Sequence, residues 1–333
     1  MKNSAYFAHK KGTNMQTQKL IQGIHHVTAT VNDAQEDYDF YTRVLGMRLV
    51  KKTVNFDNVH VYHFYYADEL GTPGTVFTTF PYKGQPNVKQ GTEGSGMILT
   101  TALSVPTDAL PFWEQRLHAH GVLLTHGERF GQPFLWFRDP SGLQIELIGD
   151  DSDTRAPWLN PSEPEIIADF AIRGIHHVML SVAPEHWVSM IDFLTAEMNM
   201  VVAAEENNRV RLNVNGGGAG HYLEMRRDAY SHKGRNGIGT VHHVAWKVAD
   251  DEALMAMQAR IAELGLNPTE FRDRKYFHSV YFKPSAGMWF EMATMQPGFT
   301  VDESREELGT HLHLPEWEEP KRVEIEAVLP RLS

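Results

Sequence analysis

The hydrophobic pattern of residues 239–248 is that of a β-strand, because β-branched and aromatic residues follow a glycine and alternate with more polar ones. Successive side chains of a strand point to opposite faces. His242 therefore shares a face with Val244 and Trp246, which we interpret as the core face, whereas His243 falls on the other, more mixed face. The pattern separates the two histidines of this doublet and directs His243 away from the apolar side.

The same strand recurs along the chain. Histidine doublets occupy equivalent positions in three strands, at residues 25–26, 176–177 and 242–243. A fourth strand, residues 97–105, has similar surroundings without histidines, and Thr100 stands in it where His243 stands in the third doublet. Self-similarity of this kind indicates a repeated structural unit.

Each copy of the strand is followed by similar elements. A helical pattern comes next, over residues 33–45, 111–120, 185–198 and 250–264. Short strands bounded by turn residues follow, and each unit closes on a strand that begins with glycine. Three closing strands have the pattern Gly-x-x-x-Glu and the first has threonine instead; their last residues are Thr78, Glu146, Glu224 and Glu291. The sequence therefore predicts an α+β protein of four βαβββ modules.

A polar stretch rich in glycine, proline, aspartate and serine, residues 149–164, separates the second module from the third. We therefore predict two domains, with modules one and two in residues 20–150 and modules three and four in residues 165–299. Residues 1–19 are polar and basic, and we expect a disordered leader there. Residues 300–333 are acidic and lie outside the repeats, so we expect an appended C-terminal tail that can cover the site.

The composition excludes several classes of function. The 333 residues include no cysteine, which removes disulfides, thiolate nucleophiles and cysteine-ligated metal sites. A net charge of −11 without a basic run argues against nucleic-acid binding. The chain has no apolar run of the ~18 residues that a membrane helix needs, so we expect a cytoplasmic protein. Eighteen histidines leave open a metal site built from histidines and carboxylates.

Four βαβββ modules with these strands resemble the vicinal oxygen chelate superfamily, which includes glyoxalase I, bleomycin-resistance proteins and type I extradiol dioxygenases. The resemblance covers the whole repeat region. It implies that modules pair into open, cup-shaped mixed sheets. It also implies that first-strand and last-strand residues of two paired modules hold a metal ion.

The residues leave the choice of paired modules open. Modules one and two, or two and three, would supply a single histidine each. Modules three and four would supply four ligands, as in a glyoxalase that uses a metal ion as a Lewis acid: His177, Glu224, His243 and Glu291. Modules one and four would supply His26, Thr78, His243 and Glu291. Two histidines and one carboxylate are the ligand set of non-haem Fe(II) oxygenases, which keep positions for a substrate oxygen and O₂.

Four motifs carry a finer resemblance. They are Glu69-Leu-Gly-Thr-Pro-Gly-Thr75, Thr78-Thr-Phe-Pro81, Asp273-Arg-Lys-Tyr-Phe277 and Gly298-Phe-Thr-x-Asp302-Glu303. From about residue 23 to residue 309 the chain is similar to the hydroquinone-type ring-cleaving dioxygenases. The resemblance implies that module one pairs with module four, and that Fe(II), or Mn(II) as the alternative, is held by His26, His243 and Glu291.

Further residues are candidates for binding the substrate. The resemblance implies that Tyr281 faces the substrate and orients it or transfers a proton; the alternative is a half-buried strand tyrosine. Looser candidates for binding the substrate are Thr78, His242, Arg274 and His278. Around residues 273–276 the chain is shorter than the chlorohydroquinone enzymes, which bears on the choice of substrate.

Other polar residues have two interpretations each. His25 and His242 either support the metal ligands or belong to the core. His60 and His63 fall on opposite faces of one strand, so at most one lines the cup. The remaining set is either a second site that has lost its function or a group of solvated rim residues, and we favour the rim; it comprises Glu146, His177 and Glu224.

We therefore predict an Fe(II)-dependent, extradiol-type dioxygenase of aromatic catabolism, which inserts O₂ next to a hydroxyl carbon of a hydroquinone. Its partners would be a small aromatic substrate and O₂, and a homo-oligomer is left open. One alternative is a glyoxalase-type lyase or isomerase built on modules three and four. The other is a non-catalytic protein that binds an aromatic compound and confers resistance, against which the complete two-histidine, one-carboxylate set argues.

Overall fold

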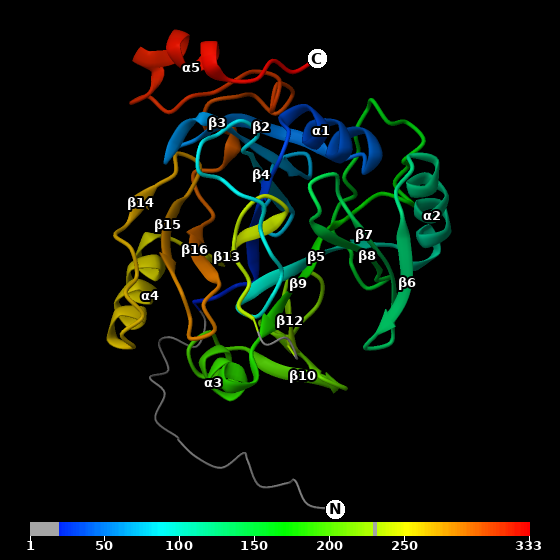
Figure 1. Cartoon of the computed structure of the whole chain (residues 1–333), viewed down its shortest axis with the longest axis vertical. Helices are drawn as coiled ribbons and strands as arrows, with labels where there is room; N and C mark the ends of the chain where they lie inside the picture. The colour runs from blue at the N-terminus through cyan, green and yellow to red at the C-terminus, as the bar shows by residue number, and fades with distance from the viewer. Residues whose placement is uncertain (1–19, 229–231) are drawn as a thin grey trace, which may run out of the picture.

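The computed structural model describes residues 20–228 and 232–333 and contains two curved eight-stranded sheets (Figure 1). The first sheet has the order β14 (Arg272–Asp273), β15 (His278–Phe282), β16 (Trp289–Thr294), β13 (Thr240–Val248), β1 (Ile24–Val31), β4 (Val76–Pro81), β3 (Asn58–Ala67) and β2 (Arg48–Asn55). The second has the order β10 (Val201–Glu206), β11 (Arg209–Asn213), β12 (Tyr222–Arg227), β9 (Gly174–Val182), β5 (Met97–Val105), β8 (Gln144–Gly149), β7 (Gln132–Arg138) and β6 (Leu124–Arg129). The leader expected at residues 1–19 lies outside the described residues.

Each sheet combines two modules from different halves of the chain. Strands of modules one and four form the first sheet, and strands of modules two and three form the second. The seam of each sheet is an antiparallel pair of first strands, β1 with β13 and β5 with β9. The predicted α+β class, the four modules and the cup-shaped mixed sheets are confirmed, as is the pairing of module one with module four. Each sheet takes one module from either side of the polar stretch at residues 149–164.

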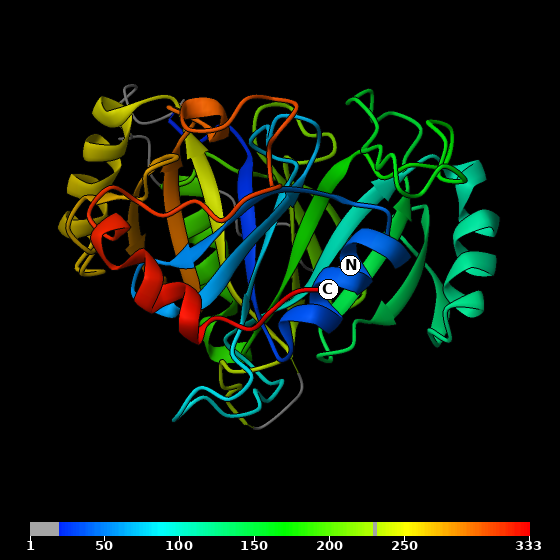
Figure 2. The ribbon, with the colours of Figure 1, turned by 90° about the horizontal axis from the view of Figure 1, so that it is seen from above.

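Helices flank the two sheets on the outside (Figure 2). They are α1 (Ala34–Asp39), which continues as the π-helical turn η2 (Phe40–Val44), then η3 (Thr107–Ala109), α2 (Leu110–Ala119), η4 (Pro184–His186), α3 (Trp187–Ala196) and α4 (Asp251–Glu263). Asp33 and Asp250 begin α1 and α4, since their side chains accept hydrogen bonds from backbone N–H groups of the first turn. The helix expected over residues 33–45 is therefore present but divided.

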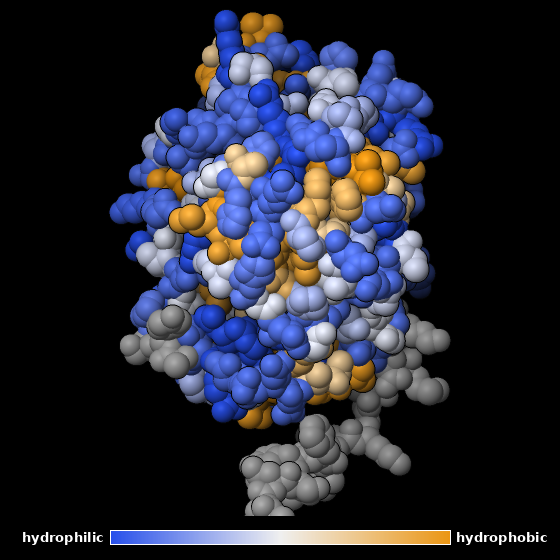
Figure 3. All heavy atoms as spheres, turned by 90° about the vertical axis from the view of Figure 1, so that its right-hand side faces the viewer, coloured by the Kyte–Doolittle hydropathy of each residue, from blue (hydrophilic) through white to orange (hydrophobic). Residues whose placement is uncertain are grey.

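Large apolar side chains fill the space between sheets and helices. Val244 and Trp246 on β13 are fully buried there, and Trp113 of α2 is buried in the same core. Figure 3 shows that the outer surface on the α2 side is largely hydrophilic, with hydrophobic residues gathered across its middle. Within the described part of the chain, no helix has the length and apolar character needed to cross a bilayer.

The C-terminal tail folds back onto the edge of the first sheet, and it contains η5 (Phe299–Val301), η6 (Glu319–Lys321) and α5 (Arg322–Val328). Leu312 forms a bridge with Lys52 on β2, and the hydroxyl of Tyr62 on β3 donates to the carbonyl of Pro330 at 3.0 Å. Nζ of Lys51, a fully buried lysine, lies 2.6 Å from Oδ1 of Asp302 and also pairs with Glu303. One buried cation of β2 thus fastens the start of the tail.

Replacement of Lys51 by alanine should destabilise the protein by about 3–5 kcal/mol, because it leaves two carboxylates without their buried cation. Urea denaturation measures the change in unfolding free energy. The control is Lys83→Ala, which removes an exposed lysine paired with Asp33 and should leave stability nearly unchanged. Equal losses in the two variants would show that the Lys51 pairs do not fasten the tail.

Candidate metal centre

Three strands of the first sheet bring the predicted ligands together. His26 lies on β1, His243 on β13, and Glu291 on β16, which runs parallel to β13. Nε2 of His26 lies 3.2 Å from Nε2 of His243 and 3.2 Å from Oε2 of Glu291; Nε2 of His243 lies 2.8 Å from that oxygen. All three residues are buried, and their donor atoms are placed to hold one metal ion.

His25 fixes the tautomer of His26. Nε2 of His25 lies 3.0 Å from the backbone oxygen of Thr294, which can only accept a hydrogen bond, so Nε2 carries the hydrogen. Burial lowers the pKa of His25 to about 3, so the ring is neutral and its Nδ1 is an acceptor. Nδ1 of His26, 2.8 Å away, therefore donates to it, and Nε2 of His26 turns a lone pair to the cluster. Metal binding at Nε2 of His26 would require this tautomer, so His25 orients His26 as a ligand would need to be oriented.

Glu291 is held at one oxygen and open at the other. Ser279 on β15 donates to Oε1, whereas Oε2 accepts no hydrogen bond from the described residues although two imidazole nitrogens lie beside it. A buried carboxylate oxygen beside two imidazole nitrogens fits a cation, which would neutralise the charge and engage the facing lone pairs.

The cluster borders a cavity of about 180 Å³. The cavity has room for a small molecule. Aromatic residues form much of its wall: Phe56, Tyr65, Phe80, Tyr82 and Phe277. Phe277 packs against both His25 and His26, with ring centres 5.0 and 5.1 Å apart.

His242 also lines this cavity. The face on which it was expected to join the core is indeed buried at Val244 and Trp246, but His242 itself is only half-buried. Its Nδ1 lies 2.7 Å from Nδ1 of His243. Within the described part of the chain its Nε2 makes no hydrogen bond, so that atom is free to meet a molecule in the cavity.

Tyr281 and Arg274 form a polar pair in the cavity wall. The ring of Tyr281 stands edge-on to His243 with centres 5.6 Å apart, and Nε of Arg274 donates to its hydroxyl oxygen at 3.3 Å. Arg274 also donates to Oδ2 of Asp57 at 2.9 Å. Burial raises the pKa of Tyr281 above its ordinary value, so the phenol is neutral and keeps a hydrogen to donate. The two residues offer a cation and a hydroxyl donor beside the metal ligands.

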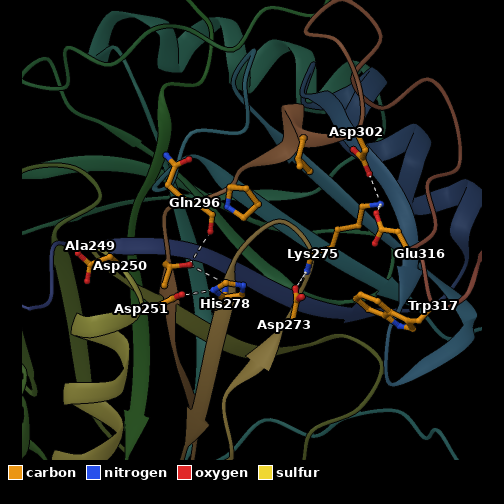
Figure 4. A pocket seen from close by; sticks show the side chains of 13 residues that line it. Ala249, Asp250, Asp251, Asp273, Lys275, His278, Gln296, Asp302, Glu316 and Trp317 are labelled. Atoms are coloured by element: carbon orange, nitrogen blue, oxygen red, sulfur yellow. Dashed lines mark hydrogen bonds and ion pairs between the residues drawn. The ribbon is translucent and has the colours of Figure 1, made fainter.

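Two of the looser candidates lie outside this cavity. Thr78 is buried behind it, donates to Oγ1 of Thr28 at 2.8 Å and is hydrogen-bonded to Nε2 of His63. His278 points into a neighbouring cleft of about 520 Å³, where Nδ1 lies 2.6 Å from Oδ1 of Asp251 (Figure 4). Of the two histidines on β3, His63 lines the cavity and His60 is exposed.

The sequence interpretation missed several residues of the site. Ser279 holds the carboxylate of Glu291, and Asn55 and Asp57 lie in the cavity wall at the turn between β2 and β3. A signal existed only for Ser279, a small polar residue two positions before Tyr281 in an otherwise bulky strand. Asn55 and Asp57 belong to an ordinary turn in the sequence, and they reach the site only because the sheet curls.

The second sheet shows that one expectation was wrong. Glu146, His177 and Glu224 are buried, not solvated rim residues. The guanidinium of Arg129 lies among them, with Nε 2.6 Å from Oε2 of Glu224, and Nη2 2.6 Å from Oε2 of Glu146 and 3.3 Å from Nε2 of His177. A side-chain cation therefore stands where the first sheet has converging ligands. His177 and His243 lie in different sheets, so the four-ligand set of modules three and four is not assembled.

Comparisons with known proteins agree with this architecture. The model of the Glyoxalase/Bleomycin resistance protein/Dioxygenase superfamily matches residues 23–147. "Putative ring-cleaving dioxygenase MhqO" of Bacillus subtilis is 39% identical over 309 residues, which are 92% of this chain and 96% of that protein. "Chlorohydroquinone/hydroquinone 1,2-dioxygenase" of Sphingobium indicum is 35% identical over 307 residues, 90% of this chain and 92% of that protein.

Solved structures give the same result. The crystal structure of a "putative dioxygenase" from Bacillus subtilis matches with a TM-score of 0.88 and 39% identity, and the match covers 95% of this chain and 98% of that one. Glyoxalase I from Zea mays matches with a TM-score of 0.60 at 16% identity over 82% of this chain and 92% of that one, a likeness of fold alone.

Removal of a converging ligand should abolish metal binding. We expect His26→Ala and His243→Ala to lose bound iron, and His177→Ala to keep it, because His177 meets Arg129 in the other sheet. Metal content after anaerobic Fe(II) loading and desalting, measured by mass spectrometry, tests this. Loss of iron from His177→Ala alone would place the metal in the second sheet and contradict the assignment.

Replacement of His25 by alanine should weaken metal binding about 10–100-fold, the usual effect of removing a residue that orients a histidine ligand. The tautomer of His26 is then no longer fixed. Competition with a chelator measures the affinity. His25→Asn, which keeps an acceptor for Nδ1 of His26, should recover part of it, and His60→Ala is the control on an exposed histidine. A His25→Ala variant with unchanged affinity would remove the supporting role.

Proposed function

This chain belongs to the glyoxalase/bleomycin resistance protein/dioxygenase superfamily, and from that premise we propose that it is an iron(II)-dependent ring-cleaving dioxygenase acting on a hydroquinone. The observation that carries the proposal is the convergence of His26, His243 and Glu291 on one point beside a small aromatic cavity. The similarity to a chlorohydroquinone/hydroquinone 1,2-dioxygenase over nearly the whole chain supports the choice of substrate.

The kinds of ligand support the choice of iron(II). Two imidazole nitrogens and one carboxylate oxygen lie 2.8 to 3.2 Å apart, close enough to bind one ion. Three ligands on one face suit an octahedral ion such as Fe(II), and Mn(II) has the same preference. Bound there, Fe(II) would supply adjacent positions for a substrate oxygen and O₂ and mediate electron transfer between them.

The protein would hold a single ring next to that face. Phe277, in the bend between β14 and β15, and Phe80 on β4 border the cavity and offer apolar surface to a benzene ring. Arg274 would stabilise the negative charge of a deprotonated substrate oxygen, and the hydroxyl of Tyr281 would donate a hydrogen bond to it or return a proton. Nε2 of His242, which lacks a hydrogen-bond partner among the described residues, would contact the bound O₂.

The cavity also limits access of water. Its volume of about 180 Å³ is below the ~300 Å³ at which pockets for larger ligands begin, so a bound ring would displace most of its water. Holding two reactants in contact and excluding water is the protein's share of this chemistry. One carbon–carbon bond of the ring would break next to a hydroxyl carbon. One atom of O₂ would enter the carboxylic acid formed at that carbon, and the other would enter the aldehyde, or its equivalent, formed at the neighbouring carbon.

Oxygen uptake by the Fe(II)-loaded protein should therefore depend on a hydroquinone. We expect one O₂ consumed per molecule of hydroquinone, chlorohydroquinone or methylhydroquinone, and much slower uptake with catechol. The electrode trace gives the rate, and mass spectrometry after reaction in ¹⁸O₂ tests whether both atoms enter the product. His243→Ala is the inactive control. Oxygen uptake with catechol but not with any hydroquinone would refute the assignment of a hydroquinone as the substrate. No oxygen uptake with any diphenol would refute the assignment as a dioxygenase.

A further inference from the structure

The second sheet contains a cavity of its own. It has a volume of about 440 Å³ and is lined by strands β5 to β9, β11 and β12, at positions that correspond to the cup of the first sheet. The guanidinium of Arg129 lies among Glu146, His177 and Glu224, where a metal ion would otherwise be bound. Among the described residues, the lone pairs of this cavity are therefore already engaged. Its remaining lining decides what it can bind.

The buried charges at the base of the cavity balance one another. Arg129 pairs with Glu146 and Glu224, and Arg211 pairs with Glu224 at 2.7 Å. At the rim, Nη2 of Arg138 lies 2.6 Å from Oε1 of Glu93. These three arginines are matched by three carboxylates, so they leave little net charge for a ligand.

Two further arginines of the cavity have no such partner. Arg209 on β11 and Arg226 on β12 stand directly opposite each other in the strand register. Like charges in that position destabilise a sheet. Within residues 20–228 and 232–333, neither guanidinium has a carboxylate within 4 Å; the close polar contact of Arg209 is Sδ of Met179, at 2.8 Å. Burial and the charges of Arg129 and Arg226 lower the pKa of Arg209.

The wall beside these arginines is flat and apolar. Trp136 is half-buried, and its indole nitrogen is held by Oε1 of Gln144 at 3.2 Å, which fixes the ring. Phe134 and Met179 complete this side of the cavity. The guanidinium of Arg138 lies over the Trp136 ring, 5.2 Å from its centre. An indole ring and a thioether in the lining of one cavity still offer apolar surface that an aromatic or conjugated molecule can contact.

We propose that this cavity is a second ligand site, which binds a small organic carboxylate with a flat, unsaturated body. Arg209 and Arg226 hold the carboxylate, since two guanidinium groups satisfy two oxygens and the ligand relieves their mutual repulsion. Trp136 and Met179 contact the body. Ring opening next to a hydroxyl carbon produces such an acid, so the product of the first cup belongs to this class; that link, unlike the site itself, rests on the proposed function.

Calorimetric titration of the metal-free, full-length protein with benzoate tests the site without any need for catalysis. We expect one benzoate to bind per chain, and its affinity to fall as sodium chloride rises from 50 to 500 mM. Uncharged benzamide and inorganic sulfate should bind at least about tenfold more weakly than benzoate. The double variant Arg209→Gln/Arg226→Gln should weaken benzoate binding by at least about tenfold. Its melting temperature should not fall, because the substitution removes a like-charge pair.

Two controls locate the bound benzoate. Arg227→Gln removes one positive charge from an exposed neighbouring residue and should leave benzoate binding unaltered. Arg274→Gln removes the cation of the first cup and should also leave it unaltered. The proposal fails if the wild-type protein does not bind benzoate, if sulfate or benzamide binds as tightly, or if the loss occurs in Arg274→Gln instead. It also fails if the double variant binds benzoate as the wild type does.

Discussion

The antiparallel pairing of β1 with β13 is the interaction on which the candidate metal centre depends. His26 and His243 are 217 residues apart in the chain, and this one seam places their Nε2 atoms 3.2 Å apart. Glu291 arrives by the parallel pairing of β16 with β13. No single module contains all three residues, so the centre forms only when modules one and four assemble into the first sheet. Pairing of the modules in chain order would separate His26 from His243 and Glu291.

The same seam also explains what the sequence could and could not predict. The repeat of first and last strands identified the modules, and the count of histidines and carboxylates favoured the pair that forms the first sheet. Strict alternation along a strand failed locally, because register shifts interrupt β1 between Ile24 and His26 and again between Thr28 and Ala29. His25 therefore does not simply share the face of Val27, and its Nδ1 contacts Nδ1 of His26. Alternation along the strand does not predict this contact.

Residues brought in by the curl of the sheet were out of reach for a different reason. Asp57 and Arg274 come from opposite edges of the same sheet, and their contact at 2.9 Å exists because the edges approach each other. Periodicity describes which face a residue occupies, but not how far that face bends. The burial of Glu146, His177 and Glu224 was missed on the same grounds, since the cation that makes burial tolerable, Arg129, lies on a strand whose sequence carries no repeat signal.

The second sheet contains the same arrangement of a histidine doublet as the first, but with a different partner for its inner histidine. In the second sheet, Nε2 of His176 lies 3.2 Å from the carboxylate of Asp150, which accepts its hydrogen, and Nδ1 atoms of His176 and His177 lie 2.8 Å apart. By the argument made for His25, His177 must then turn a lone pair inward, where it meets Nη2 of Arg129 at 3.3 Å. In the second cup the doublet thus orients a lone pair towards a guanidinium, and in the first cup it orients one towards the candidate metal centre. A guanidinium satisfies its lone pair permanently. The lone pair of His26 is left for the exchangeable ion that we propose, and only such an ion would support chemistry on a second molecule.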